Sequence, residues 1–121
     1  MIETLFEEPG LPSVELPPAL RSAFGGNLGV PTPVVYANFV TSLDGVAAFA
    51  DGTPPSAISG GSSADRLVMG LLRALADTVL IGAETLRTEP DHLWTPDWIY
   101  PDLSGEFRTL RRKLGLPESP R

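Results

Sequence analysis

A glycine and a threonine are spaced so that they could hold a ligand at the end of a short apolar stretch. Gly82 and Thr85 directly follow the apolar residues 78–81, and open α/β sheets bind ligands beyond the carboxyl ends of their strands. A bare Gly82 lets a ligand approach the backbone, and the Thr85 hydroxyl can bond a phosphate or an amide. The same residues also fit an ordinary turn between a strand and a helix.

A carboxylate at Asp44 is a second candidate, because it follows the apolar stretch 34–41. At the edge of a sheet it could orient a polar substrate or relay a proton. An aspartate before Gly45 is equally typical of a tight turn, in which the carboxylate bonds its own backbone.

Arg73 lies in a strongly apolar helical stretch and could bind a phosphate through two parallel hydrogen bonds. It could also be a surface arginine that pairs with Asp77 four residues later. Ser56 and Ser59 lead into the start of this helix, where anions often bind, although ordinary loop chemistry explains them too.

The aromatic residues after Pro90 allow two interpretations. Trp94, Trp98 and Tyr100 could line an aromatic ligand site, but the packing of a lid onto the core is the default interpretation. His92 is interpreted as a loop residue. It is the only histidine, and the chain has no cysteine, which excludes multi-histidine and thiolate metal sites. Neither a GxGxxG nor a Walker motif occurs.

An alternation of strands and helices must position these residues. Residues 34–41 and 78–81 are rich in β-branched and aromatic side chains, which predicts strands, the first one covered on both faces. Apolar spacing predicts a long helix at 62–76 and a last helix near 105–114 capped by Asp102 or Ser104, and a shorter helix is expected at 83–88. Residues 90–103 are expected to form a loop. The pattern indicates an α/β fold with a largely parallel sheet that has too few strands.

Composition limits the partners. The 121 residues include 9 basic and 15 acidic side chains, a net charge of −6, which argues against nucleic acid as the main partner. The basic cluster at 108–113 is interpreted as a solvated helix face. No apolar run is long enough for a membrane span, and no leader is visible, so a cytoplasmic protein is expected.

Three motifs, in this order and spacing, resemble a known family. They are Ser-Leu-Asp-Gly at 42–45, Leu-Arg-Ala-Leu-Ala-Asp at 72–77 and Gly-Ala-Glu-Thr-Leu-Arg at 82–87. Residues 34–93 thereby resemble the amino-terminal half of the reductase domain of riboflavin biosynthesis, a pyrimidine reductase. The resemblance implies a dihydrofolate-reductase-like three-layer sandwich with a mostly parallel central sheet, incomplete in this chain. Residues 1–33 would form an irregular arm, and 34–121 the first half of the domain.

The resemblance also implies a function. The family reduces an aminopyrimidine phosphate with NADPH. Cofactor contacts are expected at Gly82, Ala83, Thr85, Glu89 and Leu93. Substrate contacts are expected at Asn38, Ser56, Ser59 and Arg73, with Asp44 at the strand edge that faces both ligands.

Two other functions stay open beside the reductase. One is a non-catalytic module of the same fold that binds a nucleotide or a pterin. The other is a purely structural half-domain that pairs with another chain. The apolar strand at 34–41 needs further sheet neighbours, so a second polypeptide is expected. This would be the carboxyl-terminal half of the same protein, as a separate chain or a missing segment, and a homodimer of complete domains is implied by the family.

Overall fold

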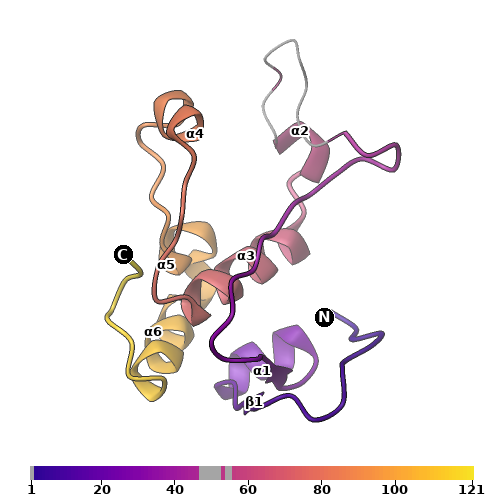
Figure 1. The fold of residues 1–121 in the computed structure, drawn as a ribbon, viewed down its shortest axis with the longest axis vertical. Coiled ribbons are helices and arrows are strands. Elements are labelled where there is room, and N and C mark those ends of the chain that lie inside the picture. The colour runs from indigo at the N-terminus through magenta and orange to yellow at the C-terminus, as the bar shows by residue number, and fades with distance from the viewer. Residues whose placement is uncertain (1, 47–52, 54–55) are drawn as a thin grey trace.

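The computed structural model describes residues 2–46, 53 and 56–121, and Figure 1 shows its arrangement. The order of elements is β1 (Ser13–Val14), α1 (Pro18–Phe24), β2 (Leu28–Gly29), α2 (Ser56–Ser59), α3 (Ser63–Leu75), α4 (Ala83–Thr88), α5 (Pro96–Ile99), a short 3-10 helix (Pro101–Leu103) and α6 (Ser104–Lys113). No helix in the described part of the chain is long and apolar enough to cross a membrane.

The core is a cluster of buried apolar side chains contributed by α1 and the residue Leu16 before it, by α3 and by α6. Its members are Leu16, Leu20, Leu67, Leu71, Ala74, Phe107 and Leu110. Leu16 and Leu20 belong to the amino-terminal arm (residues 1–33), so part of this arm packs on the body. The outer part does not, because Leu5 and Phe6 are 90% and 82% exposed.

The central helix α3 forms as its apolar spacing predicts. The Ser62 hydroxyl accepts a hydrogen bond from the Asp65 N–H at 3.3 Å, which caps the first turn. The buried face of α3 packs against α6. A Cβ atom at Gly70 would lie 2.9 Å from Cζ of Phe107, so the close approach of that ring explains a glycine inside the helix.

The two predicted inner strands are not strands in the structure. Residues 34–41 and 78–81 are extended but belong to no sheet, and their apolar side chains are open to solvent: Val35 is 91% exposed, Phe39 78% and Leu80 86%. The described residues form one sheet, in which β1 and β2 pair antiparallel within the arm. The expected mostly parallel central sheet is therefore not present there. A strand is stable only when neighbouring strands satisfy its backbone, and the described part of the chain supplies no such ladder.

The directions of these two segments still match a strand-helix-strand unit. In Figure 1, residues 34–43 and 77–82 both run upward, opposite to α3. The Tyr36 hydroxyl donates a hydrogen bond to the Leu72 carbonyl of α3, which holds the first segment to the helix. Burial and Asp77 raise the pKa of Tyr36, while Arg111 lowers it.

Residues 90–103 are more ordered than the predicted loop. Thr95 accepts a hydrogen bond from the Trp98 N–H at 3.3 Å and starts α5. The Arg66 side chain of α3 donates two hydrogen bonds, of 3.0 and 2.7 Å, to the Ile99 carbonyl. These bonds join α5 to α3, a long-range contact that local composition does not predict.

The predicted cap and surface of α6 also need correction. Neither Asp102 nor Ser104 caps it with a side chain, and the Ser104 hydroxyl donates to the Pro101 carbonyl at 2.7 Å. Leu114, which follows α6, is 40% exposed. Arg111, interpreted above as part of a solvated face, is 0% exposed. Its guanidinium is buried because backbone carbonyls surround it: those of Arg73, Ala74, Ala76 and Pro117.

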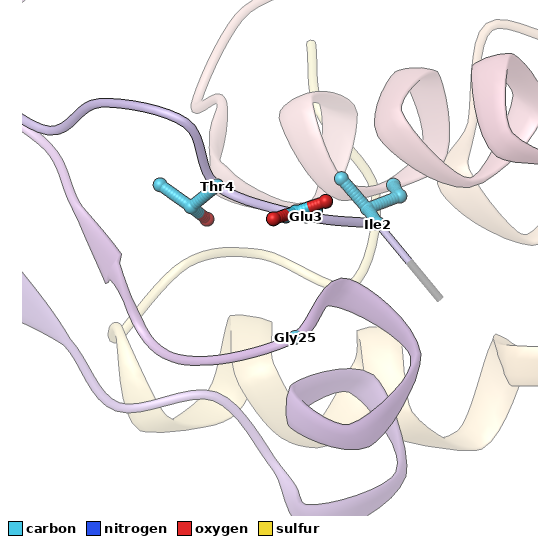
Figure 2. A pocket seen from close by; sticks show the side chains of 4 residues that line it. All are labelled: Ile2, Glu3, Thr4 and Gly25. Carbon is cyan, nitrogen blue, oxygen red and sulfur yellow. The ribbon is translucent and has the colours of Figure 1, made fainter.

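A shallow hollow lies between the start of the chain and the end of α1 (Figure 2). It is lined by Ile2, Glu3, Thr4 and Gly25, none of which is a predicted site residue. The Ile2 N–H donates to the Ala23 carbonyl at 3.2 Å, so the hollow is where the chain start docks on α1. It has no geometry suited to the predicted chemistry.

Gly25 should be sensitive to substitution. Its φ is +96°, and an added Cβ would collide with the Ile2 carbonyl oxygen. We expect Gly25→Ala to lower the free energy of unfolding by about 1–2 kcal/mol, because an L side chain is strained in this conformation. Urea denaturation measures this, with Gly26→Ala as the matched control, since no atom lies within 4 Å of a Cβ there. Equal stability of both variants would show that the chain start does not dock as described.

Candidate functional site

The turn at the start of α4 forms as predicted. Gly82 is extended, with φ −67° and ψ 142°, and its carbonyl accepts the Leu86 N–H at 3.1 Å. A Cβ at Gly82 would lie 3.7 Å from the Thr85 hydroxyl oxygen, so this hydroxyl lies beside the bare face of the glycine. Ala83 and Thr85 are exposed, and both are accessible to a ligand.

Glu89 ends α4 and joins it to an aromatic stack. Its Oε2 lies 2.9 Å from Nδ1 of His92. The His92 ring stacks on Trp94, with centroids 4.1 Å apart and planes at 27°, and lies 4.1 Å from Trp98 at a tilt of 46°. The Glu89 carboxylate therefore orients an imidazole held between two indoles.

Arg73 of α3 lies at the other end of this stack. Its Cζ is 5.1 Å from the centroid of the Trp94 ring, a cation–π distance, and burial lowers its pKa. We call the five residues Arg73, Glu89, His92, Trp94 and Trp98 the His92 cluster. It connects a predicted substrate residue, Arg73, to a predicted cofactor residue, Glu89.

Three buried nitrogen atoms of the His92 cluster have no hydrogen-bond partner within the described part of the chain. They are Nη1 of Arg73, Nε2 of His92 and Nε1 of Trp94. The arginine and indole nitrogens are donors, and the imidazole nitrogen donates when it is protonated. Buried donors without partners cost free energy, so a ligand that accepts hydrogen bonds would be stabilised here. The indole face of Trp98, which is 44% exposed, can also stack a planar ring.

The pattern of the RibD C-terminal domain family matches residues 33–103. The chain belongs to this family. The match covers more than half of the chain and includes every candidate site residue. Members of the RibD C-terminal domain family are reductase domains with a dihydrofolate-reductase-like fold, and they typically use NADPH. No curated protein and no solved structure matches the chain.

The other predicted residues of the RibD C-terminal domain site lie apart from the His92 cluster. Asp44 is in a turn closed by Gly45 N–H to the Ser42 carbonyl at 2.9 Å, and its Oδ1 accepts the Ser42 hydroxyl. This turn and α4 lie far apart at the top of Figure 1. Asn38 is exposed in the same extended segment. Asp44 therefore lies in a turn as the second interpretation expected, although its carboxylate bonds the Ser42 hydroxyl and not the backbone. Its catalytic role stays a prediction.

The remaining residues are placed as follows. Ser56 and Ser59 begin and end α2, and the Ser56 side chain lies outside the described part of the structure. Leu93 is 57% exposed beside the His92 cluster in sequence. His92 was interpreted as a loop residue, and Trp94 and Trp98 were left open between a ligand site and a lid on the core. The spacing of Glu89 and His92, three residues apart, was the one signal in the sequence that could have found this contact.

The residues at α4 suit a nicotinamide cofactor. Gly82 has no side chain to block approach, the Thr85 hydroxyl lies beside it, and Leu93 exposes an apolar surface. Among the described residues, no group of three or more histidine, cysteine, aspartate or glutamate side chains could hold a metal ion.

The His92 cluster should loosen in mild acid. Burial lowers the pKa of His92 below 6.5 and Arg73 lowers it further, against the Glu89 carboxylate, which raises it. The unfolded chain then binds a proton at higher pH than the folded chain does. The contribution of neutral His92 to the stability of the folded chain is therefore complete above about pH 6.5. It falls as the pH drops through the lowered pKa.

We therefore expect the melting temperature to fall between about pH 7.5 and pH 5, with a red shift of tryptophan fluorescence. In His92→Gln this pH dependence should be smaller, because the titrating ring is gone. A wild-type pH profile that matches the variant's would show that His92 does not titrate in this range.

Proposed function

We propose that this chain carries the cofactor-binding and substrate-binding turns of an NADPH-dependent reductase. Its substrate would be a pyrimidine or a pterin-like small molecule, as in the 5-amino-6-(5-phosphoribosylamino)uracil reductase step of riboflavin biosynthesis. The observation that carries the proposal is the family match over residues 33–103, within which all candidate residues fall.

We assign different roles to two groups of residues. Gly82, Ala83 and Thr85 would hold the cofactor, with Glu89 and Leu93 beside them. NADPH supplies a hydride when it is bound. The chain's own residues then position the electrophilic carbon of the substrate, which is the main contribution of the protein to hydride transfer.

Substrate binding would fall to Asn38, Ser56, Ser59 and Arg73. The unpartnered Arg73 Nη1 supports this role for Arg73, because a guanidinium nitrogen that lacks an acceptor can bond an anionic group. Asp44 would orient the substrate or deliver a proton. Catalysis needs the turn that carries this carboxylate to lie closer to α4 than the backbone in Figure 1 places it.

That separation favours a second candidate function. A non-catalytic module of the same fold would bind a nucleotide or a pterin at α4 and the His92 cluster without using Asp44. The two functions differ in turnover and not in binding, so an assay that measures both distinguishes them.

NADPH oxidation with the aminopyrimidine phosphate tests the proposal. We expect loss of absorbance at the nicotinamide band, with one reduced product formed for each NADPH consumed, when the chain is combined with the rest of the reductase domain. Binding of NADPH without oxidation would support the module instead. No binding would contradict both functions.

A further inference from the structure

Two large apolar side chains of the amino-terminal arm are open to solvent. Leu5 is 90% exposed and Phe6 82%. Both line a hollow of about 540 Å³ that shares Ile2 with the hollow in Figure 2 and also has Phe24 and Leu28 in its wall. We call it the arm hollow. Apolar side chains are stabilised when they leave water, so the arm hollow favours an apolar occupant.

The backbone around the arm hollow is held in place at both ends. The Ile2 N–H donates to the Ala23 carbonyl at 3.2 Å. The Glu7 carboxylate lies against the backbone of Gly29, where an added Cβ would collide with it. Residues 3–6 therefore project from a fixed loop, and a partner that binds there pays little entropy for ordering the chain.

Carboxylates surround the arm hollow. Its lining includes Glu3, Glu7 and Glu8, and all three residues are exposed. Within the described part of the chain, none of these three carboxylates lies in an ion pair. Complementary charge selects between apolar partners, so the arm hollow suits an apolar side chain that is flanked by positive charges.

The end of α6 has this chemistry. Leu114 directly follows the helix and is 40% exposed. It comes after Arg112 and Lys113, which are exposed as well. We call residues 112–114 the α6 end. Lys113 Nζ lies 3.5 Å from Oε2 of Glu15 in the same chain, so one arm carboxylate already lies beside this basic cluster.

The α6 end does not reach the arm hollow of its own chain. In Figure 1 the start of the arm lies at the lower right and the α6 end at the lower left, with α1 between them. Both surfaces thus lie along one end of the molecule. A two-fold axis along this end, at right angles to the line that joins the two surfaces, brings each arm hollow onto the α6 end of the other copy. Such reciprocal contacts close a dimer.

We propose that two copies of this chain associate through this reciprocal contact. Leu114 of each copy enters the arm hollow of the other, and the basic side chains of the α6 end face the carboxylates around it. Both surfaces lie outside residues 33–103, the part that matches the RibD C-terminal domain family. The contact is therefore independent of the proposed function, and its test uses no cofactor and no turnover.

The first test is sedimentation of the 121-residue chain over a range of concentrations. We expect a monomer–dimer equilibrium in the micromolar range, typical of a small interface. A rise in salt from about 0.05 M to about 0.5 M should weaken it about tenfold, because opposite charges face each other across the contact. A chain that stays monomeric at about 0.5 mM and low salt would overturn the proposal.

The second test exchanges the charges. The arm variant carries Glu3→Lys and Glu8→Lys, and the helix variant carries Arg112→Glu and Lys113→Glu. Each variant alone should stay monomeric, because like charges then meet at both contacts. Their 1:1 mixture should dimerise about as tightly as the wild-type chain, because opposite charges are restored at both contacts. Association of either variant alone, or no association of the mixture, would overturn the proposal.

The third test separates the arm from the other exposed apolar surface of the chain. Phe6→Ser should weaken the dimer about tenfold or more, since a buried aromatic side chain is lost from the contact. Val35→Ser is the matched control, because Val35 is 91% exposed in the extended segment 34–41, and it should leave the dimer unchanged. A dimer weakened by Val35→Ser alone, or equally by both substitutions, would overturn the contact through the arm.

Discussion

We expect Arg111→Ala to lower the free energy of unfolding by about 3 kcal/mol or more, because hydrogen bonds from a charged donor are worth about 1.5–3 kcal/mol each. The guanidinium is fully buried and donates to carbonyls of Arg73, Ala74, Ala76 and Pro117. Its removal leaves these buried or partly buried acceptors without their charged donor. Urea denaturation followed by circular dichroism measures the loss.

Arg112→Ala is the matched control for this variant. Arg112 is the next residue of α6 and is exposed, and its side chain donates to the nearby Thr109 hydroxyl at 3.2 Å. Its substitution should change stability by less than about 0.5 kcal/mol. Equal effects of the two substitutions would mean that Arg111 does not hold α3, α6 and the tail together.

The second large effect concerns turnover. We expect Asp44→Asn to lower the rate of NADPH oxidation by about 100-fold, in the range of general acid–base catalysis. The amide keeps an oxygen that can accept the Ser42 hydroxyl but carries no charge and transfers no proton. Thermal melting should therefore change little while turnover falls.

Ser42→Ala separates catalysis from turn formation. It removes the hydroxyl that bonds both Asp44 and the Val46 N–H and leaves the carboxylate intact. We expect it to lower stability more than Asp44→Asn does and to lower turnover less. Full turnover with reduced stability in Asp44→Asn would assign Asp44 to the turn alone.

The helices were predictable because their signals are local. Ser62 and Asp65 cap α3, and the apolar spacing that follows defines its buried face, including the close contact of Gly70 with Phe107. The helix at Ala83–Thr88 begins after Gly82 and ends before Pro90, as expected. In each case residues a few positions apart determine the conformation.

The strands and the buried polar contacts depend on residues far apart in sequence. Residues 34–41 have the composition of a strand, but composition does not supply a neighbour to pair with. From the sequence alone Arg111 is predicted to be solvated, because the backbone carbonyls that it bonds lie up to 38 residues away. The Trp94 contact with Arg73 likewise depends on how the loop at 89–98 folds back onto α3.

Titration with NADPH, followed by tryptophan fluorescence, tests the central claim that the α4 turn binds the cofactor. Both tryptophans of the chain, Trp94 and Trp98, belong to the His92 cluster, which Glu89 joins to the end of α4. Cofactor bound at Thr85 should quench them saturably by energy transfer.

Thr85→Val should weaken this binding about tenfold, the equivalent of one buried hydrogen bond. The control Thr109→Val, whose hydroxyl donates to its own helix at the Gly105 carbonyl, should bind NADPH as tightly as the wild-type chain. Saturable quenching that Thr85→Val weakens and Thr109→Val preserves is the predicted result. No saturable quenching, or equal affinity in all three proteins, would contradict the account.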